Sequence, residues 1–166
     1  MRHSWPHLHW FLGACLALVG ATTSAHARQA VGAWSGWAAF SDPEPRRCYA
    51  IAAPDFASVP AWASVSSWPG RNRRAEVHFR LSRIARPGSA AIADVDGTPF
   101  ALAVRGADAW AATRDGERAL VAAMRRGVAL RVQSRDERGR AFVDGYRLAG
   151  AASAIDAALI ACAARG

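Results

Sequence analysis

The chain has 166 residues and carries 21 basic residues, all of them arginine, against 13 acidic ones, which gives a formal net charge of +8. This balance favours solubility and an attraction to polyanions, although scattered arginines also follow from an arginine- and alanine-rich genome composition. After one apolar segment near the start, no stretch is long and apolar enough to cross a bilayer, which excludes a helical membrane protein once that segment is removed.

The first residues predict an export signal. Arg2 precedes the apolar run Trp10–Val19, and Ala25-His26-Ala27 matches the small-residue pattern that signal peptidase recognises, so residues 1–27 are predicted to be removed before Arg28. Two alternatives are a retained anchor and a lipoprotein modified at Cys15. The predicted mature protein is periplasmic or secreted and bacterial, without a membrane span.

The remaining residues, 28–166, are predicted to form a single domain that buries about two-thirds of its unfolded surface. This part contains two cysteines, Cys48 and Cys162, and an even number of cysteines in an exported protein predicts a disulfide. With only two cysteines, one pairing within the chain is available. No C-x-x-C motif is present, so a structural bond is favoured over a redox function.

The first half of the domain indicates strands separated by an irregular segment. Val31–Phe40 and Cys48–Ala53 are predicted strands, with a Pro-rich turn between them. Residues 54–74 are predicted to be irregular, except that Val65 can belong to a short edge strand. Strict alternation of apolar and polar residues over Glu76–Leu81 then predicts a half-buried strand.

The second half predicts two hairpins and two helices. Asp96-Gly97 lies between alternating apolar runs and is the strongest hairpin signal. A helix capped by Asp115 is predicted to end at Gly127, and two strands follow over 128–132 and 142–148. A capping box beginning at Ser153 predicts the last helix. We therefore expect a mainly β fold, an antiparallel β-sandwich with immunoglobulin-like layers, a short helix and a C-terminal helix.

An ordered set of short motifs spans about residues 31–162: Gly32-x-Trp34, Cys48-Tyr49-Ala50-Ile51, Pro87-Gly88-Ser89, Val95-Asp96-Gly97-x-x-Phe100-x-Leu102, Gly106-Ala-Asp108-Ala-Trp110, Val121-Ala-Ala-Met124-Arg-Arg-Gly127 and Tyr146-x-Leu148-x-Gly150. In this set the chain resembles the invasion-associated locus B family of exported bacterial proteins. The resemblance implies a β-sandwich with a terminal helix, the disulfide Cys48–Cys162, and a periplasmic or secreted location. Some relatives are linked to host-cell invasion. The chain departs from the family pattern over about residues 54–75.

Two features suggest catalysis, and each has a simpler interpretation. Asp94-Val95-Asp96-Gly97-Thr98 resembles the D-x-D-G-T motif of haloacid-dehalogenase-like phosphatases, but the chain has no lysine and no later Asp-Asp pair for that chemistry, which favours a hairpin turn. His78 is the only histidine after residue 27 and lies on the polar side of its predicted strand, where it could act as a base only beside an acid and a nucleophile. No cofactor or metal site is predicted.

The predicted binding surface lies in the irregular segment, where aromatic and basic side chains alternate in the sequence. It comprises Trp62, Trp68, Arg71, Arg73 and Arg74. Such a composition is typical of surfaces that bind polyanions, although local packing of the tryptophans is an alternative. Trp34 and Trp110 are predicted to pack in the core. The expected partner is a protein or a polyanionic envelope or host-surface ligand, not a nucleic acid.

Together, these features predict an exported, non-catalytic binding or envelope module rather than an enzyme. One alternative is a small exported hydrolase that uses His78 or the pair Asp94 and Asp96. Another is a purely structural envelope protein without a ligand.

Overall fold

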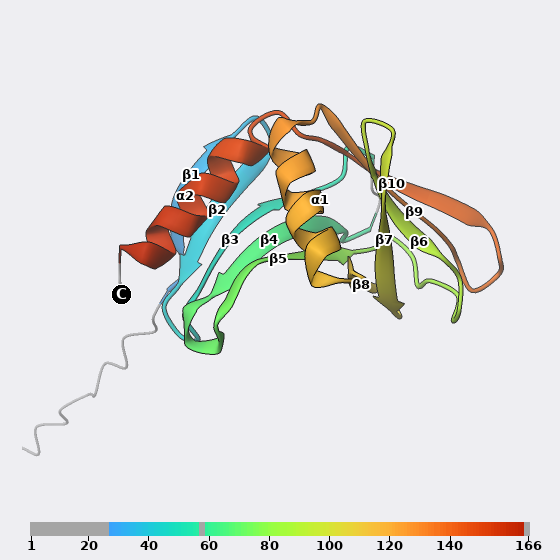
Figure 1. Ribbon diagram of the computed structural model, residues 1–166, viewed down its shortest axis with the longest axis horizontal. Coiled ribbons are helices and arrows are strands. Elements are labelled where there is room, and N and C mark those ends of the chain that lie inside the picture. Colours follow the sequence, from blue (N-terminus) through green and yellow to red (C-terminus); the bar gives the residue numbers. More distant parts are fainter. Residues whose placement is uncertain (1–26, 57–58, 165–166) are drawn as a thin grey trace, which may run out of the picture.

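The computed structural model of the chain describes residues 27–56 and 59–164, which form a mainly antiparallel β fold with two α-helices (Figure 1). The elements in chain order are β1 (Gln29–Trp34), β2 (Trp37–Asp42), β3 (Arg47–Ala52), β4 (Trp62–Trp68), the single 3-10 turn η1 (Pro69–Arg71), β5 (Arg73–Arg80), β6 (Ala91–Val95), β7 (Thr98–Arg105), β8 (Asp108–Ala111), α1 (Arg114–Arg126), β9 (Ala129–Arg135), β10 (Ala141–Arg147) and α2 (Ala151–Ala163). The predicted fold class and the C-terminal helix are confirmed.

The ten strands form one continuous sheet in the order β1-β2-β3-β4-β5-β8-β7-β6-β9-β10, and all neighbours are antiparallel. The prediction of two separate sandwich sheets with immunoglobulin-like layers is therefore not confirmed. β1 and β10 are the two edges of the sheet.

The sheet curls, so that its last strand returns towards the first ones (Figure 1). The indole Nε1 of Trp37 on β2 donates a hydrogen bond to the carbonyl oxygen of Arg147 on β10 at 2.9 Å. The backbone N–H of Asp55, after β3, donates to the carbonyl oxygen of Gly145 at 2.8 Å. These two bonds join strands that are far apart in the order of the sheet.

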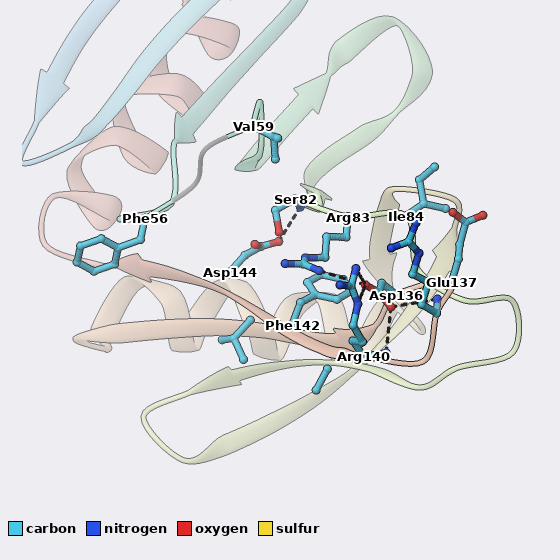
Figure 2. A pocket seen from close by; sticks show the side chains of 13 residues that line it. Phe56, Val59, Ser82, Arg83, Ile84, Asp136, Glu137, Arg140, Phe142 and Asp144 are labelled. Atoms are coloured by element: carbon cyan, nitrogen blue, oxygen red, sulfur yellow. Dashed lines mark hydrogen bonds and ion pairs between the residues drawn. The ribbon is translucent and has the colours of Figure 1, made fainter.

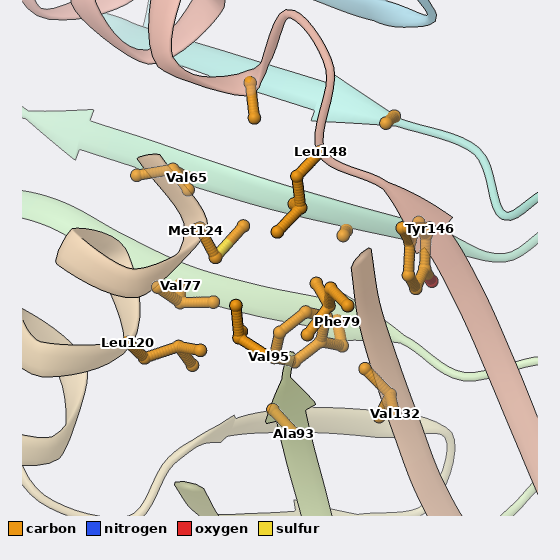
Figure 3. Close-up of a cluster of buried hydrophobic side chains, with 14 of the residues drawn as sticks. Val65, Val77, Phe79, Ala93, Val95, Leu120, Met124, Val132, Tyr146 and Leu148 are labelled. Atoms are coloured by element: carbon orange, nitrogen blue, oxygen red, sulfur yellow. The ribbon is translucent and has the colours of Figure 1, made fainter. Parts of the chain in front are cut away.

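The core lies inside the curl, between both halves of the sheet and α1 (Figure 3). Alternate residues of β5, Val77 and Phe79, are fully buried there, as the strict alternation of the sequence predicts. Leu120 and Met124, four residues apart on α1, face the same core and are also fully buried. α1 therefore seals the inner face of the sheet beside β5 and β8.

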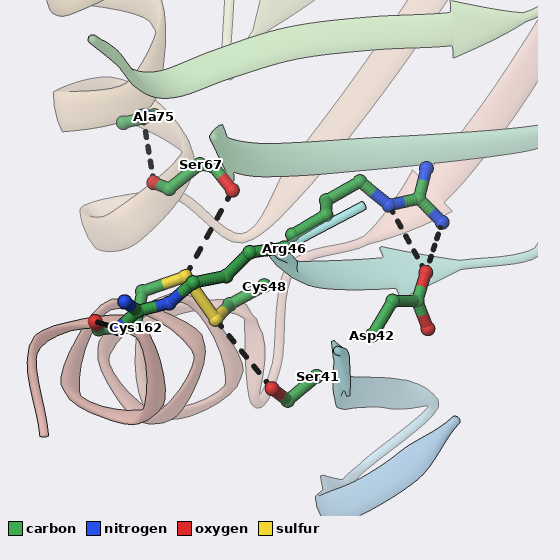
Figure 4. Close-up of a disulfide and its surroundings, with 8 residues drawn as sticks. Ser41, Asp42, Arg46, Cys48, Ser67, Ala75 and Cys162 are labelled. Carbon is green, nitrogen blue, oxygen red and sulfur yellow. Dashed lines mark hydrogen bonds and ion pairs between the residues drawn. A yellow bond between two sulfur atoms is a disulfide. The ribbon is translucent and has the colours of Figure 1, made fainter. Parts of the chain in front are cut away.

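α2 packs on β1, β2 and β3 and is bonded to the sheet through the disulfide Cys48–Cys162 (Figure 4). The two Cα atoms are 5.7 Å apart, within the range usual for disulfides. Both cysteines are buried together with Ala39 and Ala158. The Arg46 guanidinium donates to the carbonyl oxygen of Cys162, at the last turn of α2, where cations are favoured. The predicted pairing of the cysteines is confirmed.

The irregular segment of the prediction contains a complete strand. β4 lies between β3 and β5, so the prediction of a short edge strand around Val65 is wrong. Val65 is buried in the core, and Ser64 and Ser66 are buried as well. Serines on the outer face removed the apolar alternation on which the prediction of strands depends.

The segment 31–40 was predicted to be one strand, but in the structure it forms most of a hairpin of two strands, β1 and β2. The chain turns at Ser35 and Gly36, whose φ angles of 46° and 95° lie in the left-handed region. Ser-Gly is a turn signal that the aromatic residues on both sides obscured.

Both helices begin earlier than the sequence predicted. The cap of α1 is Thr113, whose hydroxyl oxygen accepts a hydrogen bond from the Gly116 N–H at 3.0 Å, rather than Asp115. α2 begins after Gly150, which adopts a φ of 85°, and Ser153 lies within its first turn. The capping box predicted from Ser153 is therefore wrong, because the positive φ of a glycine starts this helix.

The predicted signal peptide lies outside the described residues, apart from Ala27. Within the part of the chain that the structure describes, no helix has the length and apolar character that a membrane span requires.

Gly150 provides a test of the junction between β10 and α2. A Cβ atom at Gly150 would collide with the carbonyl group of Trp34, whereas a Cβ at Gly36 would meet nothing within 4 Å. Both residues have positive φ, so alanine costs about 1 kcal/mol of backbone strain at either position. We expect Gly150→Ala to lower the free energy of unfolding by about 1–3 kcal/mol more than Gly36→Ala, measured by urea denaturation. Equal losses would contradict the close approach of Trp34.

Candidate binding surfaces

Three aromatic rings stack on the outer face of the sheet, opposite the helices. They belong to Trp62 on β4, His78 on β5 and Trp110 on β8, which lie on neighbouring strands. The Trp62 ring meets the His78 ring edge-on, with centroids 4.6 Å apart, and the His78 and Trp110 rings are parallel at 4.8 Å. Trp62 and Trp110 are both half-buried, so their rings remain partly open to solvent.

His78 has an acidic partner, which the sequence did not reveal. Its Nε2 lies 3.0 Å from a carboxylate oxygen of Asp108, and the other oxygen of Asp108 accepts a hydrogen bond from Arg80 at 2.8 Å. The nearest serine in the register is Ser64, whose hydroxyl contacts the His78 carbonyl oxygen at 3.4 Å. Among the described residues, no hydroxyl bonds to the His78 ring, so the arrangement has a base and an acid but no nucleophile.

The D-x-D-G-T segment is a hairpin turn, as the simpler interpretation of the sequence predicted. Asp96 and Gly97 form the two-residue turn between β6 and β7, with φ angles of 49° and 88°. The Asp94 carboxylate accepts from the Gly97 N–H at 3.1 Å. The Asp96 carboxylate accepts from the N–H groups of Val128 and Ala129 at 2.8 and 2.9 Å. Both carboxylates thus accept hydrogen bonds from backbone N–H groups. This structural role argues against the hypothesis of a hydrolase that uses Asp94 and Asp96.

The five residues of the predicted binding surface do not form one cluster. Trp68, Arg71, Arg73 and Arg74 gather around the turn between β4 and β5, whereas Trp62 lies at the opposite end of β4, about 20 Å along the strand. Trp68 and Arg73 are neighbours across the two strands. The guanidinium of Arg71 lies over the Trp68 ring, with its carbon 5.2 Å from the centroid, and Arg47 of β3 lies at 5.1 Å.

A pocket of about 470 Å³ opens between this turn and the start of α1. Arg73 and Arg74 form one side of it. The full lining is Asn72, Arg73, Arg74, Glu76, Trp110, Ala111, Ala112, Thr113, Arg114, Glu117 and Arg118. Four guanidiniums face two carboxylates, and Arg74 has no ion-pair partner among the described residues, so the lining carries a net positive charge.

The start of α1 strengthens the positive character of this basic pocket. The first turn of the helix, with the positive end of its dipole, forms part of the pocket wall, and its Gly116 N–H is bonded to the Thr113 hydroxyl. Glu117 in its first turn accepts a hydrogen bond from the Val77 N–H at 3.1 Å. Burial raises the pKa of the Glu117 carboxyl above its usual value, against the lowering effect of that bond. A negatively charged group in the pocket would therefore find mostly donors.

Among the aromatic and basic residues of the lining, the sequence prediction missed Trp110, Arg114 and Arg118. Trp110 was expected in the core, but it lines the pocket and stacks on His78. Its alternation with the buried Ala109 was the available signal, because neighbours on a strand face opposite sides. Arg114 and Arg118 come close to Arg74 only through the path of the chain from β8 into α1, which has no local signal.

Comparison with protein-family models, curated proteins and solved structures finds no match to this chain. Within the residues that the structure describes, no group of histidine, cysteine, aspartate or glutamate side chains is placed to hold a metal ion.

A second pocket, of about 580 Å³, lies beside β10 and is lined by Asp136, whose carboxyl group has a lowered pKa. Burial by itself would raise the pKa of Asp136. Hydrogen bonds from the side chain and N–H of Arg140 and from the side chain of Arg83 outweigh burial and lower this pKa to about 2. The Arg140 and Arg83 contacts measure 2.8 and 3.1 Å.

The low pKa of Asp136 predicts a loss of stability in acid. Because the folded pKa lies below the unfolded value of 3.8, the contribution of the carboxylate is fully present above about pH 4 and is lost as the pH falls towards 2. We expect Asp136→Asn to be less stable than the original protein at pH 6, and the difference to shrink between pH 4 and 2. Urea unfolding at stepped pH measures it, and a difference that stays constant over this range would contradict the assignment.

Proposed function

We propose that this protein is an exported, non-catalytic binding module of the bacterial cell envelope that takes a polyanionic ligand in the basic pocket between the β4–β5 turn and α1. The proposal agrees with the resemblance to the invasion-associated locus B family. It also agrees with the disulfide Cys48–Cys162, a kind of bond that is usual in oxidising compartments such as the periplasm.

One observation carries the proposal, namely the excess of arginine over carboxylate in the basic pocket. Arg74 lacks a carboxylate partner among the described residues, and Arg71, next to the pocket but outside its lining, lies over the Trp68 ring. Guanidinium groups bind carboxylate, phosphate and sulfate through paired hydrogen bonds. The half-buried Trp110 supplies an apolar wall beside them. This combination suits an acidic group attached to a larger, partly apolar unit.

A small exported hydrolase is the second candidate, and the contact between His78 and Asp108 favours it. A carboxylate that holds an imidazole is one half of a general-base arrangement. If the protein hydrolyses a simple ester such as p-nitrophenyl acetate, His78→Gln must abolish that activity. An unchanged rate in the variant would mean that the hydrolysis comes from a contaminating enzyme or from other side chains of the protein, and not from His78.

The binding proposal is tested with a heparin octasaccharide, a defined sulfated polyanion, by isothermal titration calorimetry. The variant changes Arg71, Arg73 and Arg74 to serine together. Three exposed charge contacts of about 0.5 kcal/mol each predict a loss of about tenfold in affinity. We also expect a weaker dependence of affinity on salt, because fewer counterions are released.

The control changes Arg86, Arg105 and Arg131 to serine, which removes the same total charge. These three side chains are exposed and make no ion pair within the described residues. This control is expected to bind within about twofold of the original protein, since only long-range attraction is lost. Equal weakening of both variants would indicate a general charge effect, and no binding of the original protein would favour a purely structural envelope protein. Either result rejects the pocket as the binding site.

A further inference from the structure

The outer edge of β10 is open for part of its length. Antiparallel strands bond to a neighbour through alternate residues. Gly145 and Arg147 turn their carbonyl groups away from β9, because these oxygens accept from the Asp55 N–H and the Trp37 indole. Ala141 and Val143 belong to the same alternate set, so their N–H and C=O groups also point away from β9. Neither has a backbone partner on that side among the described residues.

Four exposed apolar side chains lie around the pocket beside this open edge. Phe56 is fully exposed, and Val143, Ile84 and Val59 are 56%, 50% and 46% exposed. All four line the pocket of about 580 Å³ that also contains Ala141 (Figure 2). Clustered apolar residues at the surface usually mark an interaction site, whereas single ones do not. An unpaired strand edge and several exposed apolar side chains therefore border the same, otherwise largely charged pocket.

The charged side chains that line the pocket differ in how far they reach into solvent. Asp136 and Asp144 are buried and are bonded to groups of the protein, Asp136 to Arg83 and Arg140, and Asp144 to the Ser82 N–H at 2.9 Å. Two guanidiniums thus share one carboxylate.

The charged side chains that reach solvent around the pocket are Arg83, Arg138 and Arg140, against the single carboxylate of Glu137. The lining as a whole is neutral, because three arginines stand against Asp136, Glu137 and Asp144, but all three arginines are exposed, so the carboxylate of a ligand can reach them.

We propose that the Ala141–Val143 edge of β10 is a docking site for an extended peptide segment, which adds to the sheet as a further antiparallel or parallel strand, with apolar residues at alternate positions and an acidic residue among the others. The backbone of such a segment supplies the partners that Ala141 and Val143 lack. Its apolar side chains cover Phe56, Ile84 and Val143. Its carboxylate forms ion pairs with the exposed arginines Arg83, Arg138 and Arg140. This site is separate from the basic pocket and does not depend on it.

The test uses a blocked six-residue peptide in which valine alternates with aspartate, and reads hydrogen exchange of individual amides by NMR. On peptide addition, we expect the Ala141 and Val143 amides to exchange at least about tenfold more slowly, because they gain hydrogen bonds. The same peptide with N-methyl groups on alternate amides is expected to bind about fivefold more weakly for each bond that it loses. A peptide with asparagine in place of aspartate is expected to bind more weakly as well.

A variant of the protein gives a second measurement. Val143→Pro removes the outward N–H, and proline is tolerated on edge strands, so the fold should persist. Unchanged exchange at the buried Val95 and Val132 amides checks this. Val143→Thr keeps the N–H and is the matched control. We expect the proline variant to lose peptide binding and the threonine variant to keep it.

Three results would overturn the proposal. The first is no change in the Ala141 and Val143 amides at millimolar peptide. The second is equal binding of the N-methylated peptide. The third is protection of these amides that grows with protein concentration in the absence of peptide, since the edge would then pair with a second copy of the chain. If Val143→Pro fails to fold, the N-methylated peptide alone decides between these outcomes.

Discussion

The disulfide between Cys48 and Cys162 is the constraint on which the arrangement of this protein depends. It joins residues separated by 114 positions, so it links β3 to α2 around most of the chain. Closing a loop of this length stabilises a folded protein by about 4–5 kcal/mol in the chain-entropy model. The bond also fixes α2 on β1, β2 and β3, with Arg46 bound at the last turn of the helix (Figure 4). One half of the sheet thereby receives its inner cover from the far end of the sequence.

The curl of the sheet follows from this arrangement and places the two candidate surfaces. Since α2 begins directly after β10, a helix held on β1–β3 brings the end of β10 next to β2, where Trp37 bonds to Arg147. The inner face is then filled by the core and the two helices. Both proposed sites lie at the rim of the sheet, one where the basic pocket meets the start of α1 and the other at the part of the β10 edge that Asp55 and Trp37 do not cover.

Local chemistry explains which parts of the fold were predictable from the sequence. The alternation of Glu76–Leu81 and the Asp96-Gly97 turn are short-range signals, and both correspond to the observed β5 and β6–β7 hairpin. β4 was missed because buried serines occupy the positions on its outer face, so the strand lacks an apolar pattern that the sequence would reveal. The start of α2 was misplaced because its cap is a glycine with positive φ, which has no side chain to indicate it.

The candidate site was predictable only in part, for a related reason. Arg71, Arg73 and Arg74 stand close together in the sequence, so their cluster was visible. Their pocket partners come from the segment between β8 and α1, and contacts between distant segments depend on the order of strands. The same holds for Asp108, which reaches His78 from the neighbouring strand β8. The exposed edge of β10 also depends on strand order, since no property of residues 141–143 distinguishes an edge strand from a central one.

Hydrogen exchange along α2, before and after reduction of the disulfide, tests the central constraint most directly. If Cys48–Cys162 holds α2 on the sheet, the amides of Ala154–Ala163 exchange slowly in the oxidised protein and lose most of their protection when the bond is reduced. Loss of protection in the whole protein would also agree with this, because the bond then supports the entire fold. Identical, slow exchange of these amides in both states would contradict the account.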